Sequence, residues 1–180
     1  MASVITATTS SGLTQSADNS GVLQLASGTG NLVTVPSVTG TAMVSGNMPA
    51  FSAYASSNTT LSNATLTKVN FQTEEYDTNN NFASSRFTPT VAGYYQLNSV
   101  VNTNYGPGGV IVSFYKNGSE FLRGGNIQSG TAGSSSSGLI YLNGSTDYVE
   151  TYVLTSLGGS LDADSGAHRV RFDGILVRAA

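Results

Sequence analysis

Hydrophobic residues from position 49 onward recur at every second position, in short runs that clusters of Gly, Asn and Ser separate. Three runs show this most clearly, at residues 93–101, 110–115 and 170–177. A period of two places one set of side chains on one face of a strand and the next set on the opposite face. No stretch of ten residues has the period of an amphipathic helix. The pattern therefore predicts an all-β protein.

Two dipeptides in this region, Asn117-Gly118 and Asn143-Gly144, predict tight turns between strands. Asn and Gly tolerate the positive φ angles that a type I′ hairpin turn requires. Short alternating strands joined by such turns are typical of β-sandwiches and β-barrels.

The aromatic residues divide the chain near Gly46. All nine Tyr and all seven Phe lie at or after Phe51. Because a core needs large side chains, we interpret residues 1–46 as an extended arm and residues 47–180 as a globular knob. Three pieces of the arm (21–25, 31–35 and 38–43) alternate like short strands that need another surface, although the alternative is a disordered leader. The arm positions expected to contact that surface are Val22, Leu23, Leu25, Leu32, Val33 and Val35.

Charge is sparse along the chain. Charged residues make up 9% of the 180 residues, and the formal net charge is −3 at pH 7. Seven scattered Lys and Arg cannot follow a phosphate backbone, so we expect no nucleic-acid partner. No apolar run approaches the ~18 residues of a membrane helix, and the first ten residues do not resemble a secretory signal. We therefore expect the protein to be made in a cytoplasm and not to insert into a membrane. The lack of Cys favours a reducing compartment or stabilisation by oligomerisation.

Candidate catalytic groups are few. The single His, His168, is the only base available to a Ser–His–Asp triad, and no Gly-x-Ser-x-Gly sequence accompanies it. Cys–His catalysis and multi-His metal sites are excluded by the counts of these residues. Glu74 and Glu75 are adjacent, so their carboxylates point to opposite faces of a strand and cannot flank one bond. The sequence predicts a protein that is not an enzyme.

Asp162 and Asp164 are the candidate Ca²⁺ ligands. Both lie in one loop, where two carboxylates supply too few oxygen atoms for a tight Ca²⁺ site. We interpret this segment as a charged surface turn, and we expect the protein to need neither a metal ion nor a cofactor.

Residues 49–180 resemble the globular head domain of complement C1q, a ten-stranded jelly roll related to the tumour necrosis factor fold. The segments that carry the resemblance follow the order of the family's sequence signatures. They are Pro49-Ala50-Phe51-Ser52-Ala53-Tyr54, Val69-Asn70-Phe71, Tyr76-Asp77, Phe82, Phe87-Thr88-Pro89, Gly93-Tyr94-Tyr95-Gln96-Leu97, Lys116-Asn117-Gly118, the segment 141–149 and Phe172-Asp173-Gly174-Ile175-Leu176. Two departures are Leu97, where the family has Phe, and the extra residues between Gly144 and Asp147.

The resemblance implies a jelly-roll β-sandwich of about ten strands that assembles as a homotrimer and binds rather than catalyses. The residues expected in the core or at the trimer axis are Phe51, Phe71, Tyr94, Tyr95, Phe172 and Leu176. No collagen-like repeat precedes the knob, which argues against the complement-type members. Residues 11–25 instead resemble leader segments of tailed-bacteriophage virion proteins.

These features together predict a structural virion protein, namely a trimeric capsid decoration (cement) protein assembled in the host bacterial cytoplasm and displayed on the virion surface. Its expected partner, through the arm, is the major capsid protein or another virion protein, with the knob facing outward. A host surface glycan is a further candidate partner. The alternatives are a short head or tail fibre protein that binds a host receptor, and a bacterial adhesin or lectin.

Overall fold

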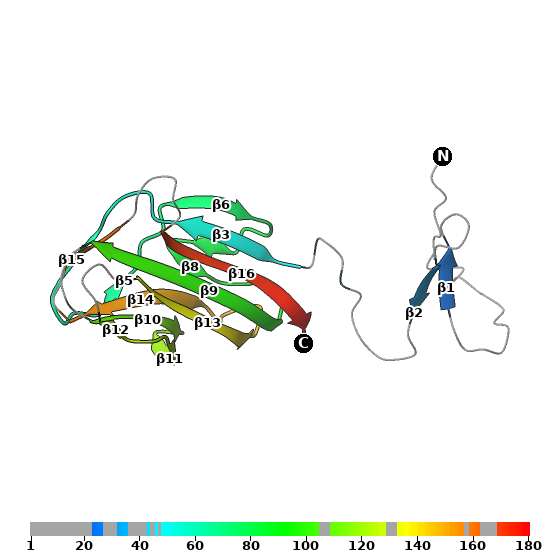
Figure 1. Cartoon of the computed structure of the whole chain (residues 1–180). Coiled ribbons are helices and arrows are strands. Elements are labelled where there is room, and N and C mark those ends of the chain that lie inside the picture. The colour runs from blue at the N-terminus through cyan, green and yellow to red at the C-terminus, as the bar shows by residue number, and fades with distance from the viewer. Residues whose placement is uncertain are drawn as a thin grey trace. The chain divides into compact units, whose positions relative to one another are not determined.

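The structure is a computed structural model of the whole chain, and it describes residues 23–26, 32–35, 43, 46, 48–104, 109–128, 133–156, 159–162 and 169–180. The chain divides into two compact units, Met1–Thr41 and Ala42–Ala180. The second unit contains the knob, which Figure 1 shows as two layers of strands.

The first unit contains one antiparallel hairpin, formed by β1 (Leu23–Ala26) and β2 (Leu32–Val35). Its register pairs Leu23 with Val35, Leu25 with Val33 and Leu32 with Ala26. Five of the six expected arm positions thus lie in these two strands. Val22 and most of the third expected strand lie outside the described residues, and Met43 is exposed and in no strand.

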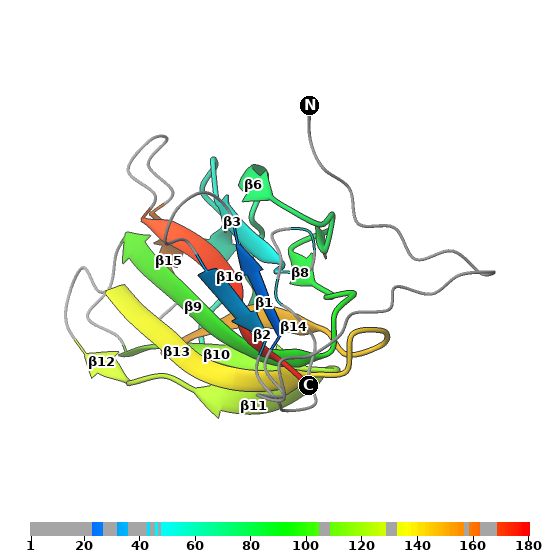
Figure 2. The same cartoon turned by 90° about the vertical axis from the view of Figure 1, so that its right-hand side faces the viewer.

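The larger layer of the knob, which we call the β9 sheet, is antiparallel. Its strands run in the order β4 (Thr60–Leu61), β15 (Gly159–Leu161), β9 (Gly93–Asn104), β16 (Val170–Ala179), β3 (Ala50–Tyr54) and β6 (Thr73–Asp77), with β13 (Gly133–Leu142) also paired to β9. Figure 1 shows β16 between β9 and β3, and Figure 2 shows β13 running beside β9. The last strand of the described chain is therefore central in its sheet.

The second layer, the β10 sheet, is also antiparallel. Its strands run in the order β11 (Ser119–Arg123), β10 (Gly109–Lys116), β14 (Val149–Thr155), β8 (Arg86–Phe87) and β7 (Phe82–Ala83), with β12 (Ile127–Gln128) paired to β10 and β5 (Thr67–Lys68) paired to β14. The two layers and their antiparallel pairing confirm the predicted all-β jelly-roll class.

The core lies between the two sheets and consists mainly of aromatic rings. Phe51 on β3 stacks on Phe87 of β8 at a centroid distance of 4.3 Å, and Phe172 on β16 lies 5.5 Å from Phe114 on β10. Both pairs join one sheet to the other, and all four side chains are buried. Aromatic pairs of this kind contribute about 0.5–1.5 kcal/mol beyond the area that they bury.

The close approach of Phe51 to β16 requires a glycine. A Cβ atom added to Gly174 would lie 2.3 Å from Leu97 Cδ2 and 2.8 Å from Phe51 Cε1. Gly174 therefore gives the ring of Phe51 the space that it fills in the core.

Candidate functional site

The outward side of the β9 sheet carries a cluster of exposed hydrophobic side chains towards one end of the neighbouring strands β13, β9 and β16. Leu139, Ile175 and Val177 are 55%, 47% and 58% exposed, values far above those of their buried neighbours in the same strands. We call this cluster the apolar face, and it consists of Tyr94, Leu139, Tyr141, Ile175 and Val177.

Strand pairing brings these residues together. Tyr94 on β9 is paired with Tyr141 on β13, and their ring centroids are 5.4 Å apart. Gln96 on β9 is paired with Leu139 of β13 on one side and with Ile175 of β16 on the other. Successive side chains of a strand point to opposite faces of the sheet, so the adjacent residues Tyr95 and Leu176 point into the core.

Polar, hydrogen-bonded side chains lie beside the apolar face on this side of the sheet. Gln96 Nε2 donates to Ser137 Oγ at 3.0 Å, and Asn98 Nδ2 donates to Asp173 Oδ2 at 3.2 Å. Arg171 Nε lies 2.8 Å from the other carboxylate oxygen of Asp173. The exposed hydrophobic cluster is thus bordered by polar side chains, which is the usual arrangement at a protein–protein contact.

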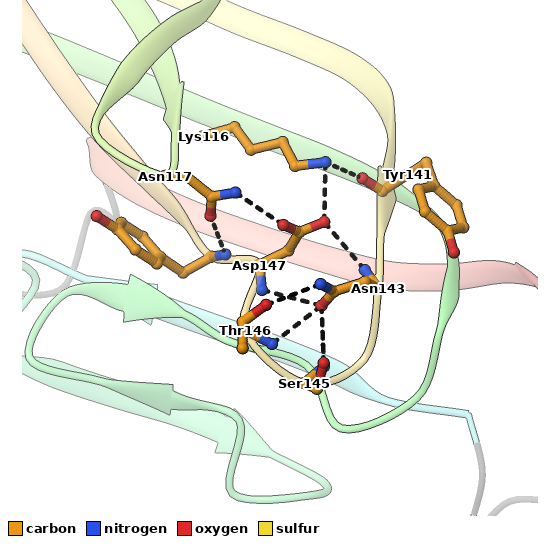
Figure 3. A network of polar contacts seen from close by, with 8 residues as sticks. Lys116, Asn117, Tyr141, Asn143, Ser145, Thr146 and Asp147 are labelled. Carbon is orange, nitrogen blue, oxygen red and sulfur yellow. Dashed lines mark hydrogen bonds and ion pairs between the residues drawn. The ribbon is translucent and has the colours of Figure 1, made fainter.

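A network of polar contacts, which we call the clasp, holds the end of β13 that presents Tyr141 (Figure 3). Lys116 Nζ donates to the carbonyl oxygen of Tyr141 at 2.8 Å and forms an ion pair with Asp147 Oδ2 at 2.9 Å. Asn117 Nδ2 donates to Asp147 Oδ1 at 2.7 Å. Figure 3 shows the ring of Tyr141 pointing away from these contacts. The clasp joins two hairpin ends and leaves that ring available to the apolar face.

The two dipeptides predicted as tight turns differ in the structure. Asn117-Gly118 joins β10 to β11 with φ angles of 52° and 80°, as a two-residue type I′ turn requires. The prediction for Asn143-Gly144 is wrong, because only Gly144 has a positive φ angle and the connection from β13 to β14 is longer. Asn143 Oδ1 instead accepts hydrogen bonds from three successive backbone N–H groups, those of Ser145, Thr146 and Asp147. Its side chain organises a loop rather than a tight turn.

The clasp predicts a specific pH dependence of stability. Hydrogen bonds from Asn117 and Lys116 hold the pKa of Asp147 below its usual value of 3.8, although burial alone would raise it. The folded state therefore binds fewer protons than the unfolded state, and this stabilisation is lost as the pH falls below about 3.8.

We expect Asp147→Asn to lower the free energy of unfolding at pH 7 by about 1–3 kcal/mol, because a charge-assisted hydrogen bond and an ion pair are lost. The variant should also lose less stability than the parent between pH 5 and pH 3, which urea unfolding at each pH measures. If the free energies of unfolding of the variant and the parent fell equally between pH 5 and pH 3, Asp147 would not be the source of this acid sensitivity.

A second charged cluster lies on the outward side of the β10 sheet. Glu150 is 3% exposed and accepts from Lys68 Nζ at 2.6 Å and from Arg86 Nε at 2.9 Å. Burial alone would raise the pKa of Glu150, but the hydrogen bonds and positive charges of both cations lower it. Arg86 also lies over the ring of Tyr148, 3.9 Å from its centroid. This carboxylate is therefore ionised and held by its neighbours.

The residues that the sequence placed in the core or at the trimer axis separate in the structure. Tyr94 is 43% exposed on the apolar face. The other five, Phe51, Phe71, Tyr95, Phe172 and Leu176, are buried within the single chain. Sequence reasoning did not place the remaining members of the apolar face at an interface, although Ile175 and Val177 alternate with buried positions in a strand that it identified.

The candidate metal ligands do not form a site in the part of the chain that the structure describes. Both carboxylate oxygens of Asp162 are engaged, by Arg169 Nη1 and by Asn104 Nδ2. Asp164 and His168 lie outside the described residues. Among the described residues, no group of three or more His, Cys, Asp and Glu is placed to hold a metal ion, and no helix is long and apolar enough to cross a membrane.

Comparison with solved structures places the knob among tumour-necrosis-factor-like jelly rolls. Murine APRIL at pH 8.5 matches with a TM-score of 0.54 and 15% sequence identity, covering 72% of this chain and 99% of APRIL. Eiger TNF from S. frugiperda matches with a TM-score of 0.52 and 8% identity, covering 74% of this chain and 93% of Eiger. No family model and no curated protein matches the sequence. The likeness defines the fold of the knob.

Proposed function

We propose that the chain is a homotrimeric structural protein of a virus particle, a capsid decoration protein of a tailed bacteriophage. In this proposal residues 47–180 form the displayed trimer, and residues 1–46 attach it to the major capsid protein or another virion protein. The observation that carries the proposal is the apolar face, where five exposed hydrophobic side chains gather on one side of the β9 sheet.

A second copy of the chain is the partner that the apolar face fits best. Copies related by a closed rotation bury the same exposed residues in every subunit, without a separate partner of matching shape. Aromatic and aliphatic side chains at the centre, with a polar border from Gln96 to Asp173, match the composition of a homo-oligomer interface. The tumour-necrosis-factor-like fold and the C1q-like sequence signatures support three copies.

The β1–β2 hairpin supports the attachment role of the arm. An isolated two-stranded hairpin is marginally stable in water, and its aliphatic positions need a surface to cover them. The arm contains no aromatic residue with which to close a core of its own. A virion surface that pairs with the hairpin or covers its aliphatic positions meets both needs.

The role on the particle is tested by counting copies. Quantitative mass spectrometry of purified particles should find the protein in hundreds of copies per capsid. Tens of copies at a vertex or the tail would indicate the short-fibre alternative instead. Absence from the particles would overturn the proposal and leave a bacterial adhesin or lectin.

The trimer is tested by placing a charge on the apolar face. Sedimentation equilibrium should give three times the 18.5 kDa chain mass for the parent and one times that mass for Ile175→Asp at micromolar concentration. A buried charge without a partner costs about 3–5 kcal/mol, and three symmetry-related copies would each introduce one.

Ile127→Asp is the matched control, because Ile127 is a similarly exposed isoleucine (44%) on the other sheet. That variant should remain trimeric, and circular dichroism should show that both variants are folded. A monomeric parent, or a trimeric Ile175→Asp variant, would contradict the assignment of this face.

A further inference from the structure

The outward side of the β10 sheet gathers two tyrosines and several of the chain's charged groups. Tyr115 on β10 and Tyr152 on β14 lie diagonally across the strand pair, with ring centroids 4.4 Å apart at an interplanar angle of 42°. Both rings are partly exposed. We call these two residues the tyrosine pair. They offer ring surface on an open sheet face, and the Tyr152 hydroxyl donates to Glu150 Oε2 at 3.4 Å.

The charged groups around the tyrosine pair are joined to one another. Lys68 and Arg86 hold Glu150 on one side. On the other side Arg123 Nε and Nη2 bind both carboxylate oxygens of Glu120, at 2.8 and 3.0 Å. These three cations and two carboxylates are all engaged in ion pairs and leave a net charge of only +1, so this face does not favour a strongly charged ligand. It presents fixed polar groups around two tyrosine rings.

A shallow hollow of about 180 Å³ adjoins the tyrosine pair along the same strands. Ile111 and Leu154, paired with each other across β10 and β14, contribute apolar lining, and Asn126 and Gln128 contribute side-chain amides. Neither side-chain amide forms a hydrogen bond with the described residues, and the buried Thr155 Oγ1 in the lining has no partner among them, whereas Ser156 Oγ accepts from the Gly109 N–H at 2.6 Å. The hollow thus combines apolar lining with side-chain amides that can donate and accept hydrogen bonds.

Gly109 opens the space that Asn126 occupies at this hollow. A Cβ atom on Gly109 would lie 2.5 Å from Asn126 Oδ1, so a larger residue would displace the amide. The tyrosine pair and the hollow lie within four residues of each other on β10, which is about 13 Å at 3.3 Å per strand residue. The two features form one continuous surface.

We propose that this surface binds a neutral oligosaccharide, with one sugar ring in the hollow and the next against the tyrosine pair. A sugar ring presents apolar C–H faces and a rim of hydroxyl groups. Tyrosine rings and the apolar lining of Ile111 and Leu154 accept the C–H faces, and amides that both donate and accept match the hydroxyl groups. A few placed polar groups around an apolar floor are the usual composition of a small-molecule site. This role goes beyond attachment to a particle.

The test uses the full chain and an array of neutral oligosaccharides of glucose, galactose, mannose, rhamnose and N-acetylglucosamine, with uronic-acid polymers alongside. Binding to at least one neutral saccharide is expected. With no Trp and nine Tyr in the chain, tyrosine fluorescence then gives the dissociation constant in solution. Tyr152→Ala and Gln128→Ala should each weaken binding at least tenfold, whereas Tyr152→Phe should retain most of it.

Tyr76→Ala is the matched control, because Tyr76 is an exposed tyrosine (48%) on β6 of the other sheet. It should bind as the parent does. Gln128 is exposed, so its replacement tests the site without disturbing the core. Binding to no saccharide, or to uronic-acid polymers alone, would overturn the proposal. If no saccharide binds but Tyr152→Ala and Gln128→Ala reduce attachment to particles, the face is a protein interface and the proposal is wrong.

Discussion

A chain that lacks residues 2–45 is expected to fold as a soluble trimeric knob and to lose its attachment to the particle. The deletion keeps Gly46, whose carbonyl oxygen accepts from Asn79 Nδ2 at 3.1 Å, and all of the aromatic core. It removes every residue of the β1–β2 hairpin. At about 25 cal/mol per Å², burying roughly 600 Å² of apolar arm surface would give about 15 kcal/mol before ordering costs, so its loss should abolish binding.

The measurement adds the purified protein to particles that lack it and quantifies occupancy by mass spectrometry. A finer variant replaces Leu23, Leu25, Val33 and Val35 by Ser, which removes two aliphatic cross-strand pairs. Its matched control replaces Gln24 and Thr34, the polar cross-strand pair between them, and should bind normally. Full occupancy by the deleted chain would move the contact to the knob.

Replacing Gly174 by Val is expected to prevent the knob from folding at ordinary temperature. The first added carbon would lie within 3 Å of both Leu97 Cδ2 and Phe51 Cε1, and Gly174 is buried between β9 and β3. Overpacking by a few atoms costs about 1–3 kcal/mol and more when the neighbours cannot move. Total stability is only about 5–15 kcal/mol. Gly174→Ala should fold with a lower urea midpoint, and Gly174→Val should appear mainly in the insoluble fraction.

Gly125→Val provides the control for this change. A Cβ atom at Gly125 would meet no heavy atom within 4 Å, so the same substitution adds the same atoms without a clash. Its free energy of unfolding, measured by urea unfolding, should lie within about 0.5 kcal/mol of the parent value. A soluble, parent-like Gly174→Val would show that the core around Phe51 can rearrange.

Strands whose hydrophobic residues alternate could be predicted from the sequence, and a strand of serines could not. Residues 170–177 alternate clearly, and the structure buries the positions that the pattern indicated. By contrast, β13 begins Gly-Ser-Ser-Ser-Ser-Gly, which has no hydrophobic signal. It is a strand because its backbone pairs with β9 over ten residues, from Gly133 to Leu142. Tertiary pairing outweighs local preference here.

The candidate sites depended on information that the sequence does not contain. Nothing in the sequence distinguishes Ile175 from an ordinary strand residue. Only the pairing of β13, β9 and β16 shows that Leu139 and Ile175 lie on the same exposed face. The tyrosine pair and the hollow likewise combine β10, β12 and β14, which are separated along the chain. The burial of Glu150 was also unforeseen, since its two cationic partners come from distant segments.

The central place of β16 has a consequence for the order of events during synthesis. Ala50 pairs with Ile175, and translation of the chain between them takes roughly 6–25 s at about 5–20 residues per second. Until β16 is made, β3 and β9 lack the strand that joins them. The nascent chain must keep its aromatic residues from aggregating, and a ribosome that stalls before residue 170 would release a product unable to complete the β9 sheet. Such a product has no finished apolar face, so assembly of the trimer that we propose would itself exclude truncated chains.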